Sequence, residues 1–408
     1  MPSCVILYHY YYPDNVVSAR HFTDLAEGLY SSGWDVEVFT GNRYCRKEGI
    51  ISPCCEIYQG VHIRRFKCPP FTQSKNIGRL LTTFCLSVKW FFALFFKRVD
   101  VVIIGTDPQF SFFIIPILAF FRPALRFAIW GFDLYPEAIS SAGIKLPGFV
   151  MGLLSWWAGI SYRRCGLLVD IGSCMRKRFL EYNPKARLET IIPWALDEPE
   201  ILETQNSTTR HELFGNAALG ILYSGTIGQA HQFEEFILLA RELRRRNASV
   251  SFCFAGQGNK YKDLQDMVTP EDVNITFAGF VDEELLPLRL ASADIHMISL
   301  RHGWEGVVVP SKFFGSLASG RPVLYCGTLN SCIAEIIQKE GLGFIIEKST
   351  IRNIADRLEE LSNNKSGLIK MQEGAFLYYK RCFSRKSQVM KWDKCLREYI
   401  GIIFHETK

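Results

Sequence analysis

The 408-residue sequence lacks several features that would each indicate a class of protein. Its 13 cysteines are scattered and odd in number, and the adjacent pair Cys54 and Cys55 lacks the paired spacing of a zinc site. No Asp-x-Asp string follows an apolar strand, and no recognisable nucleic-acid module, internal repeat or low-complexity tract is present. We therefore expect reduced thiols, no metal, no cofactor and no nucleic-acid partner.

A long uninterrupted apolar segment is also missing. Leu81–Phe96 is interrupted by Lys89, and Phe110–Phe121 by Pro116. Both segments are shorter than the ~20 residues that span a bilayer, so we expect no transmembrane helix. Met1–Tyr8 reads as a short buried strand without a basic leader or a long apolar core, which predicts no signal peptide and a cytoplasmic protein.

The composition is that of an ordered globular protein, with 48% hydrophobic and 22% charged residues. A chain of this length divides naturally into two domains of roughly 200 residues each. Residues 1–194 carry 22 Lys and Arg against 14 Asp and Glu, a net charge of +8, whereas the remainder carries 25 against 27, a net charge of −2. The basic first half indicates a membrane surface or an anionic ligand, with a solvated basic face as the alternative.

Apolar strands and amphipathic helices alternate along both halves. In residues 1–194 we expect strands at 5–8, 36–40, 61–65, 101–105, 126–130, 167–171 and 189–192, and a first helix at about 18–31. A polar stretch after Trp194 marks the domain boundary, and residues 195–385 repeat the pattern with strands at 220–224, 250–255, 275–278, 295–299, 322–325 and 344–346. The fold class is therefore α/β, with two doubly wound Rossmann-like domains and a last helix in residues 386–408.

The segment from Glu305 to Leu324 carries the clearest functional pattern. An apolar run at 307–309 predicts a strand, Pro310 and Ser311 open a helix, and Gly320 closes it. Lys312 stands at the helix entrance, where free N–H groups and a full charge suit a phosphate. The alternative is a surface lysine at a helix start.

This segment, with its Pro-Ser-Lys and Gly-Arg-Pro-Val strings, resembles the signature of family 4 retaining glycosyltransferases, especially the branch that builds colanic acid, O-antigen and capsule. The resemblance covers nearly the whole chain and implies the GT-B fold, in which two domains face each other across a cleft and the last helix crosses back to the first domain. Two departures stand out. Glu305 lies two positions early for the first glutamate of the family pattern, and Gly315 occupies the place of the second, which usually contacts the nucleotide ribose.

The resemblance also implies which residues of the second domain hold a nucleoside-diphosphate sugar. Thr226 and His231 stand where the family usually has an arginine and a lysine, and Glu305 is the candidate for a donor-sugar hydroxyl, with a solvated loop glutamate as the alternative. For Phe280 and Val281 the alternative is a buried hydrophobic turn. The expected donor-binding residues are Gly225, Thr226, Gly228, His231, Gly256, Gly258, Phe280, Val281, Arg301, Ser311 and Lys312.

In the first domain, the string Asp-Leu-Tyr-Pro-Glu from Asp133 to Glu137 resembles one found in lipid-linked polysaccharide transferases. Asp133 is the expected catalytic carboxylate beside Glu305, and Glu137 the expected acceptor contact; a helix cap and a first-turn residue are the alternatives. The loop after the first strand offers Asp14, Asn15 and Ser18 as further acceptor contacts.

The predicted function is therefore transfer of a sugar, with retention and without metal, from a UDP-type donor to a polyprenyl-diphosphate-linked or polysaccharide acceptor. The aromatic and basic segments 75–98 and 149–164, the second with Trp156 and Trp157, predict contact with the cytoplasmic face of the inner membrane, although a core helix would look the same. A catalytically silent GT-B binding protein and a nucleotide-sugar epimerase or hydrolase remain as alternatives.

Overall fold

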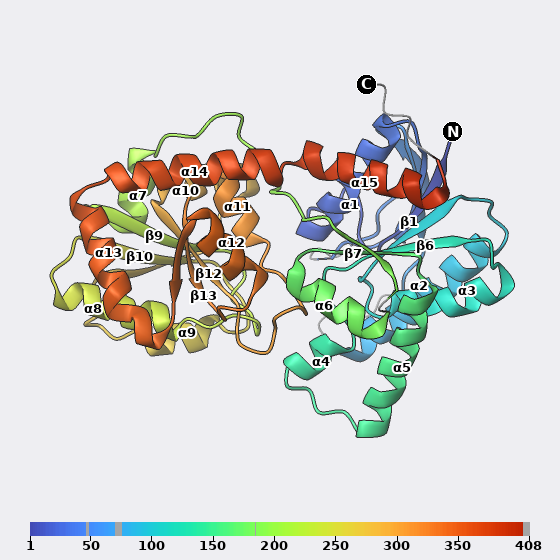
Figure 1. The fold of residues 1–408 in the computed structure, drawn as a ribbon, viewed down its shortest axis with the longest axis horizontal. Helices are drawn as coiled ribbons and strands as arrows, with labels where there is room; N and C mark the ends of the chain where they lie inside the picture. Colours follow the sequence, from blue (N-terminus) through green and yellow to red (C-terminus); the bar gives the residue numbers. More distant parts are fainter. Residues whose placement is uncertain (46–48, 70–75, 184, 403–408) are drawn as a thin grey trace. The chain divides into compact units, whose positions relative to one another are not determined.

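The computed structural model describes residues 1–45, 49–69, 76–183 and 185–402, and the chain divides into two compact units. The first unit comprises Met1–Leu196, Gly306–Val308 and the segment from Arg385, and the second comprises Asp197–Glu305 and Val309–Ser384. These divisions lie one or two residues from the boundaries expected at 194/195 and 385/386. Each unit is a sheet with helices on both faces (Figure 1).

The first unit is built on an eight-stranded sheet in the order β3-β4-β2-β1-β5-β6-β7-β8, parallel except for β3. Its strands are β1 Ser3–Leu7, β2 Asp35–Gly41, β3 Cys55–Tyr58, β4 Val61–Phe66, β5 Val101–Gly105, β6 Arg126–Trp130, β7 Leu167–Asp170 and β8 Arg187–Thr190. Its helices are α1 Val17–Ser31, α2 Asn76–Phe95, the 3-10 turn η1 Ser111–Ile114, α3 Ile115–Phe121, α4 Glu137–Ser141, α5 Gly148–Arg164, α6 Ser173–Tyr182 and the C-terminal α15 Arg385–Ile400.

Helix α15 belongs to the first unit because it packs on α1. Gly28 of α1 makes this approach close, since a Cβ there would lie 2.4 Å from Val389 Cγ1. The indole of Trp34 donates a hydrogen bond of 2.7 Å to Asp393, and Trp392 is completely buried. The end of the chain thereby forms part of the core of the unit in which the chain begins.

Helix α2 has 20 residues and is longer than the apolar segment that we considered too short to span a bilayer. Within the described residues it is the one helix whose length and composition would suffice to cross a membrane, over Gly78–Phe95, in spite of Lys89. Its inner side is nevertheless part of the core, since Leu86, Trp90 and Leu94 are completely buried.

The second unit is a six-stranded parallel sheet in the order β11-β10-β9-β12-β13-β14. Its strands are β9 Leu219–Ser224, β10 Val250–Ala255, β11 Ile275–Ala278, β12 Ile295–Ser299, β13 Val323–Cys326 and β14 Gly343–Ile346. Its helices are α7 Ser207–Phe214, α8 Glu234–Arg245, α9 Tyr261–Met267, η2 Glu283–Leu285, α10 Leu286–Ser292, α11 Lys312–Ala318, α12 Cys332–Glu340, η3 Lys348–Thr350, α13 Ile351–Asn363 and α14 Ser366–Cys382.

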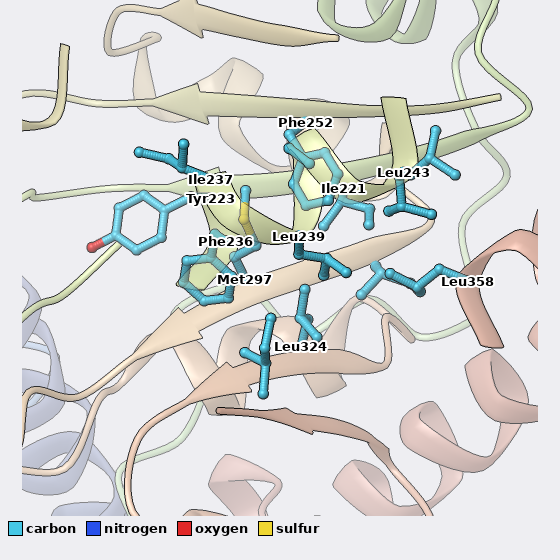
Figure 2. Packing of buried hydrophobic residues seen from close by; sticks show 14 of the residues in the cluster. Ile221, Tyr223, Phe236, Ile237, Leu239, Leu243, Phe252, Met297, Leu324 and Leu358 are labelled. Atoms are coloured by element: carbon cyan, nitrogen blue, oxygen red, sulfur yellow. The ribbon is translucent and has the colours of Figure 1, made fainter. Parts of the chain in front are cut away.

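Alternate residues of the central strands build the two halves of this core. Ile221 and Tyr223 of β9 belong to a cluster that includes residues of α8 and α13, as Figure 2 shows, whereas Leu222 between them belongs to a cluster with Leu213 of α7. A parallel strand covered by helices on both faces must be apolar at every position. This explains why these strands were recognisable as continuous apolar runs.

Two local expectations were wrong. Cys55–Tyr58 forms an antiparallel edge strand that was not predicted, because its half-exposed, mixed side chains give no apolar run. The run at 307–309 is not a strand: the carbonyl of Val307 accepts a hydrogen bond of 3.0 Å from the amide of Leu134, and its side chain is buried in the first unit. An apolar run that is buried by a loop contact looks the same in sequence as a short strand.

Candidate functional site

Two glycine-containing loops follow the adjacent strands β9 and β10 and touch each other. The amide of Gly225 donates to the carbonyl of Ala255 (2.8 Å), and that of Ile227 to the carbonyl of Gln257 (2.9 Å). Gly256 has a φ of +153°, and a Cβ there would lie 1.9 Å from the Gly225 carbonyl oxygen. Side chains are therefore excluded where the two backbones meet, and the two loops lie together at the carboxyl edge of the sheet, the usual ligand edge of this fold.

Lys312, the first residue of α11, extends to the first of these loops. Its ammonium lies 5.1 Å from the centre of the Tyr223 ring and donates one long hydrogen bond of 3.4 Å to the carbonyl of Thr226. A Cβ at Gly225 would lie 2.6 Å from the Lys312 Cε, so glycine at that position admits the lysine stem. The structure thus joins Lys312 to Gly225 and Thr226, as expected of one site.

The charge of Lys312 is poorly compensated. Burial lowers the pKa of this ammonium to about 8, and among the described residues no carboxylate forms an ion pair with it. Helix α11 has only seven residues, so its dipole is a weaker contribution than the sequence suggested. A desolvated ammonium with one long hydrogen bond has donor capacity left for an anion.

His231 holds the same loop but carries no charge. Its Nδ1 accepts a hydrogen bond of 3.1 Å from the amide of Gly228. Burial, followed by the neighbouring Lys312 charge, lowers the pKa of His231 to about 3. The imidazole is therefore neutral at physiological pH and orders the loop, whereas Thr226 contributes its carbonyl oxygen, which also accepts from the Tyr223 hydroxyl.

The remaining predicted donor residues lie on loops after neighbouring strands. Gly258 follows β10, Phe280 and Val281 follow β11, and Arg301 follows β12, where its amide donates to the carbonyl of Ala230 at 2.7 Å. Phe280 is 53% exposed, which disfavours the alternative of a buried turn for this residue. Ser311 is exposed and makes no side-chain cap on α11.

Glu305 is held by its own loop. Its carboxylate accepts from the amide of Gly303 (2.8 Å) and lies 3.3 Å from His302 Nδ1. Burial raises the pKa of Glu305, but the backbone hydrogen bonds and His302 outweigh that effect, so its pKa is lowered. The Glu305 side chain is 20% exposed and is therefore not a solvated loop glutamate, but its contacts order its own loop, and its catalytic role stays a prediction.

In the first unit, Asp133 lies after β6, and the amides of Phe132 and Asp133 donate to the Thr106 hydroxyl at 3.2 and 3.1 Å. Its side chain reaches solvent, yet the surrounding protein desolvates it and the Asp107 charge adds to this, which raises the pKa of Asp133 to about 6. Helix α4 has Pro136 as its N-cap, so Asp133 does not cap it. The structural alternative for Asp133 is therefore removed.

The other predicted acceptor residues have local structural partners. One Asp14 oxygen accepts from the amide of Val16 (3.2 Å) and the other from that of Cys45 (2.6 Å), and the side chain is buried. Glu137 stands in the first turn of α4 and accepts a hydrogen bond from the Tyr182 hydroxyl. Asn15 is exposed, and Ser18 hydrogen-bonds to Tyr8.

Sequence reasoning missed an ion pair beside Asp133. Buried His9, after β1, places Nδ1 3.5 Å from the carboxylate of Asp107, which follows the adjacent β5. Burial lowers the pKa of His9, but Asp107 and Cys68 outweigh this effect and raise it to about 9, so the imidazole is protonated at neutral pH. The sequence did contain a signal for this pair. Both residues lie just after predicted strands, and the same position after a strand made Asp133 a candidate.

Comparison with solved structures shows the fold. Over 99% of this chain and 100% of the other, the fold matches sucrose-phosphate synthase from Thermosynechococcus elongatus, with a TM-score of 0.70 and 11% identity. It also matches Anabaena HepE in complex with UDP and glucose, with a TM-score of 0.66 and 12% identity over 98% of this chain and 100% of HepE. The chain therefore has the GT-B fold, as predicted.

The sequence comparisons show which glycosyltransferases the chain resembles. Residues 218–364 match the family model described as "Glycosyl transferases group 1". "Probable glycosyltransferase WbjE" of Pseudomonas aeruginosa is 25% identical over 277 residues, 66% of this chain and 68% of WbjE. WcaI of Escherichia coli (strain K12) is 33% identical over 101 residues, 24% of each chain. The chain carries a glycosyl transferases group 1 domain, and the predicted family resemblance is confirmed.

Proposed function

We propose that this chain transfers a sugar from a nucleoside-diphosphate sugar, with UDP as the carrier, and that Lys312 binds the diphosphate. The observation that carries the proposal is the desolvated Lys312 ammonium, which lies against the loop after β9 without a carboxylate partner among the described residues. A diphosphate would supply the missing counter-charge to this ammonium. In the relative HepE, the bound ligands are UDP and glucose, which supports the choice of carrier.

The reaction that we propose is a front-face displacement with retention. The bond from the sugar C1 to the phosphate oxygen breaks, the bond from C1 to the acceptor oxygen forms, and the acceptor proton passes to the departing diphosphate. Lys312 would stabilise the charge that develops on that diphosphate, which is the role usually given to a metal ion. We therefore propose that no metal is required.

The acceptor that we propose is a polyprenyl-diphosphate-linked or polysaccharide chain of the cell surface, used at the cytoplasmic face of the inner membrane. The name of WcaI refers to colanic acid biosynthesis, which supports this class of acceptor. Asp133 is the first-unit carboxylate best placed to contact the acceptor, because it lies at the carboxyl edge of the sheet and caps no helix.

The donor assignment is tested by titrating UDP into Lys312→Ala. Loss of a charge-assisted hydrogen bond predicts a dissociation constant about 10 to 100 times higher than for the unchanged protein. Lys339→Ala, at an exposed lysine of α12, is the matched control and should bind normally. Equal UDP affinity in both variants would remove Lys312 from the site.

The reaction is tested with UDP-sugars and a lipid-linked acceptor, and NMR of the product then reports the anomeric configuration. An inverted product would refute retention, and loss of activity in a metal chelator would refute metal independence. Consumption of the donor without an acceptor would favour the epimerase or hydrolase alternative. Failure to bind any nucleotide would favour a silent binding protein.

A further inference from the structure

Three helical segments of the first unit expose large apolar side chains. On α2 and directly after it, Phe84, Phe92 and Phe96 are 67%, 60% and 82% exposed. Phe120 on α3 is 80% exposed and Phe149 on α5 is 79% exposed. We call this the three-helix surface; it consists of Leu80, Leu81, Phe84, Val88, Phe92, Phe96, Ile117, Phe120, Phe121, Phe149, Leu153 and Trp156.

The three segments are neighbours within one unit (Figure 1). The turn η1 packs against both α2 and α5, and α3 packs against α5. The rings of Phe95 and Phe121 lie 5.8 Å apart and join α2 to α3, and Arg122 donates to the carbonyls of Leu94, Phe95 and Lys97 at the end of α2. The surface is therefore held by the fold and is not formed by a loose helix.

The charge of these segments has one sign. Residues 76–98, 111–122 and 144–164 contain no Asp or Glu and carry eight cations: Arg79, Lys89, Lys97, Arg98, Arg122, Lys145, Arg163 and Arg164. Arg98, Lys145 and Arg164 are exposed. Lys97 is paired with Glu37 of β2, and Arg122 is bound to backbone carbonyls, so the charge left for a partner is that of the other six cations. An isologous dimer would place these six cations together with no Asp or Glu of the three segments to pair with them, whereas an anionic lipid surface would neutralise them.

We propose that the three-helix surface docks on an anionic lipid bilayer and inserts its phenylalanines and Trp156 into the headgroup layer. Helix α2 then lies in the interface and does not cross the membrane, because its opposite side, including Trp90 and Leu94, is part of the core. This specifies how the proposed membrane contact is made, and it does not depend on sugar transfer, since vesicle binding needs neither donor nor acceptor.

The experiment is co-sedimentation of the purified full chain with vesicles of phosphatidylglycerol and phosphatidylcholine, against vesicles of phosphatidylcholine alone. We expect binding to the anionic vesicles that weakens with added salt, and release of the bound protein by an alkaline wash. The triple variant Phe84→Ser, Phe92→Ser and Phe96→Ser should partition about tenfold or more weakly, with unchanged circular dichroism.

The matched control removes three exposed apolar side chains of the second unit, as Val273→Ser, Ile369→Ser and Leu377→Ser, which are 77%, 51% and 65% exposed, and should bind vesicles like the unchanged chain. Three results would overturn the proposal: no binding to anionic vesicles, equal loss in both triple variants, or a dimer in solution that only the α2 variant dissociates. Retention through the alkaline wash would overturn the interfacial position of α2.

Discussion

The lowered pKa of Lys312 should make donor binding depend on pH in a range where proteins stay folded. Burial lowers this pKa from 10.5 to about 8 in the unliganded protein. A bound diphosphate favours the charged ammonium and raises the pKa again. The affinity for UDP should therefore be highest well below pH 8 and should fall as the pH rises through 8. At pH 9 about one tenth of the unliganded protein is protonated, so UDP should bind about tenfold more weakly than at pH 7.

The assay is calorimetric titration of UDP at pH 7, 8 and 9 with the unchanged protein and two variants. Lys312→Arg keeps its charge throughout this range, and Lys312→Met has none. Neither variant should show the loss of UDP affinity that comes from deprotonation of Lys312. Any loss caused by titration of the uracil ring should be the same for all three proteins. The reasoning is refuted if the affinity of the unchanged protein falls between pH 7 and pH 9 by no more than that of Lys312→Arg.

The lowered pKa of Lys312 also affects the stability of the fold. Unlike an ion pair, the buried charge destabilises the folded state. Because the folded pKa lies below the unfolded one, the charged lysine costs free energy in the folded state below pH 8, and the cost disappears as the pH rises from 8 toward 10.5. Lys312→Met should therefore raise the free energy of unfolding at pH 7 by up to about 3 kcal/mol. Urea unfolding measures this, and a less stable variant would contradict it.

Three further predictions address single positions. Gly315→Glu should fold normally, because a Cβ there meets no atom within 4 Å, and should bind UDP more tightly in a titration by restoring a ribose carboxylate. Asp107→Asn should lower the pKa of Asp133, but by less than the whole shift because burial is the larger cause, and should move the acid limb of the pH–rate profile to lower pH. Gly256→Ala should cost about 2 to 4 kcal/mol in urea unfolding because of its 1.9 Å backbone clash and left-handed φ, whereas Gly228→Ala, with no contact below 3.8 Å, should be nearly neutral.

The order of strands and helices was predictable because most strands are buried on both faces. β5, β6, β10, β11 and β12 have the residues that the sequence indicated. The prediction of a strand at 307–309 failed because the structure of this segment depends on a contact with a distant segment. The run that begins at Val307 carries the apolar signal of a strand, but its partner is the amide of Leu134, which no local pattern reveals.

The candidate site was predictable where it depends on the order of strands and loops along the chain. The glycine loops and Lys312 lie in the order and at the sheet edge that the sequence indicated. Asp14 is the instructive counter-example, because its position after a strand suggested a ligand contact while its oxygens bind two loop amides. The pair of His9 and Asp107 was missed because it joins residues 98 positions apart, which only the adjacency of β1 and β5 brings together.

In the loop after β9, which contains Gly225, Thr226 and His231, one set of contacts fixes the conformation and a different residue supplies the charge. Backbone contacts and His231 set its conformation, and burial lowers the pKa of His231 to about 3, so the imidazole is neutral at physiological pH. In the proposed donor site the charge would come from Lys312 and from Arg301, whose loop is tied to Ala230 through the backbone and whose side chain is exposed. A site with a fixed conformation and one titratable cation should lose donor affinity with rising pH without losing its shape, which separates it from a site that fails by unfolding.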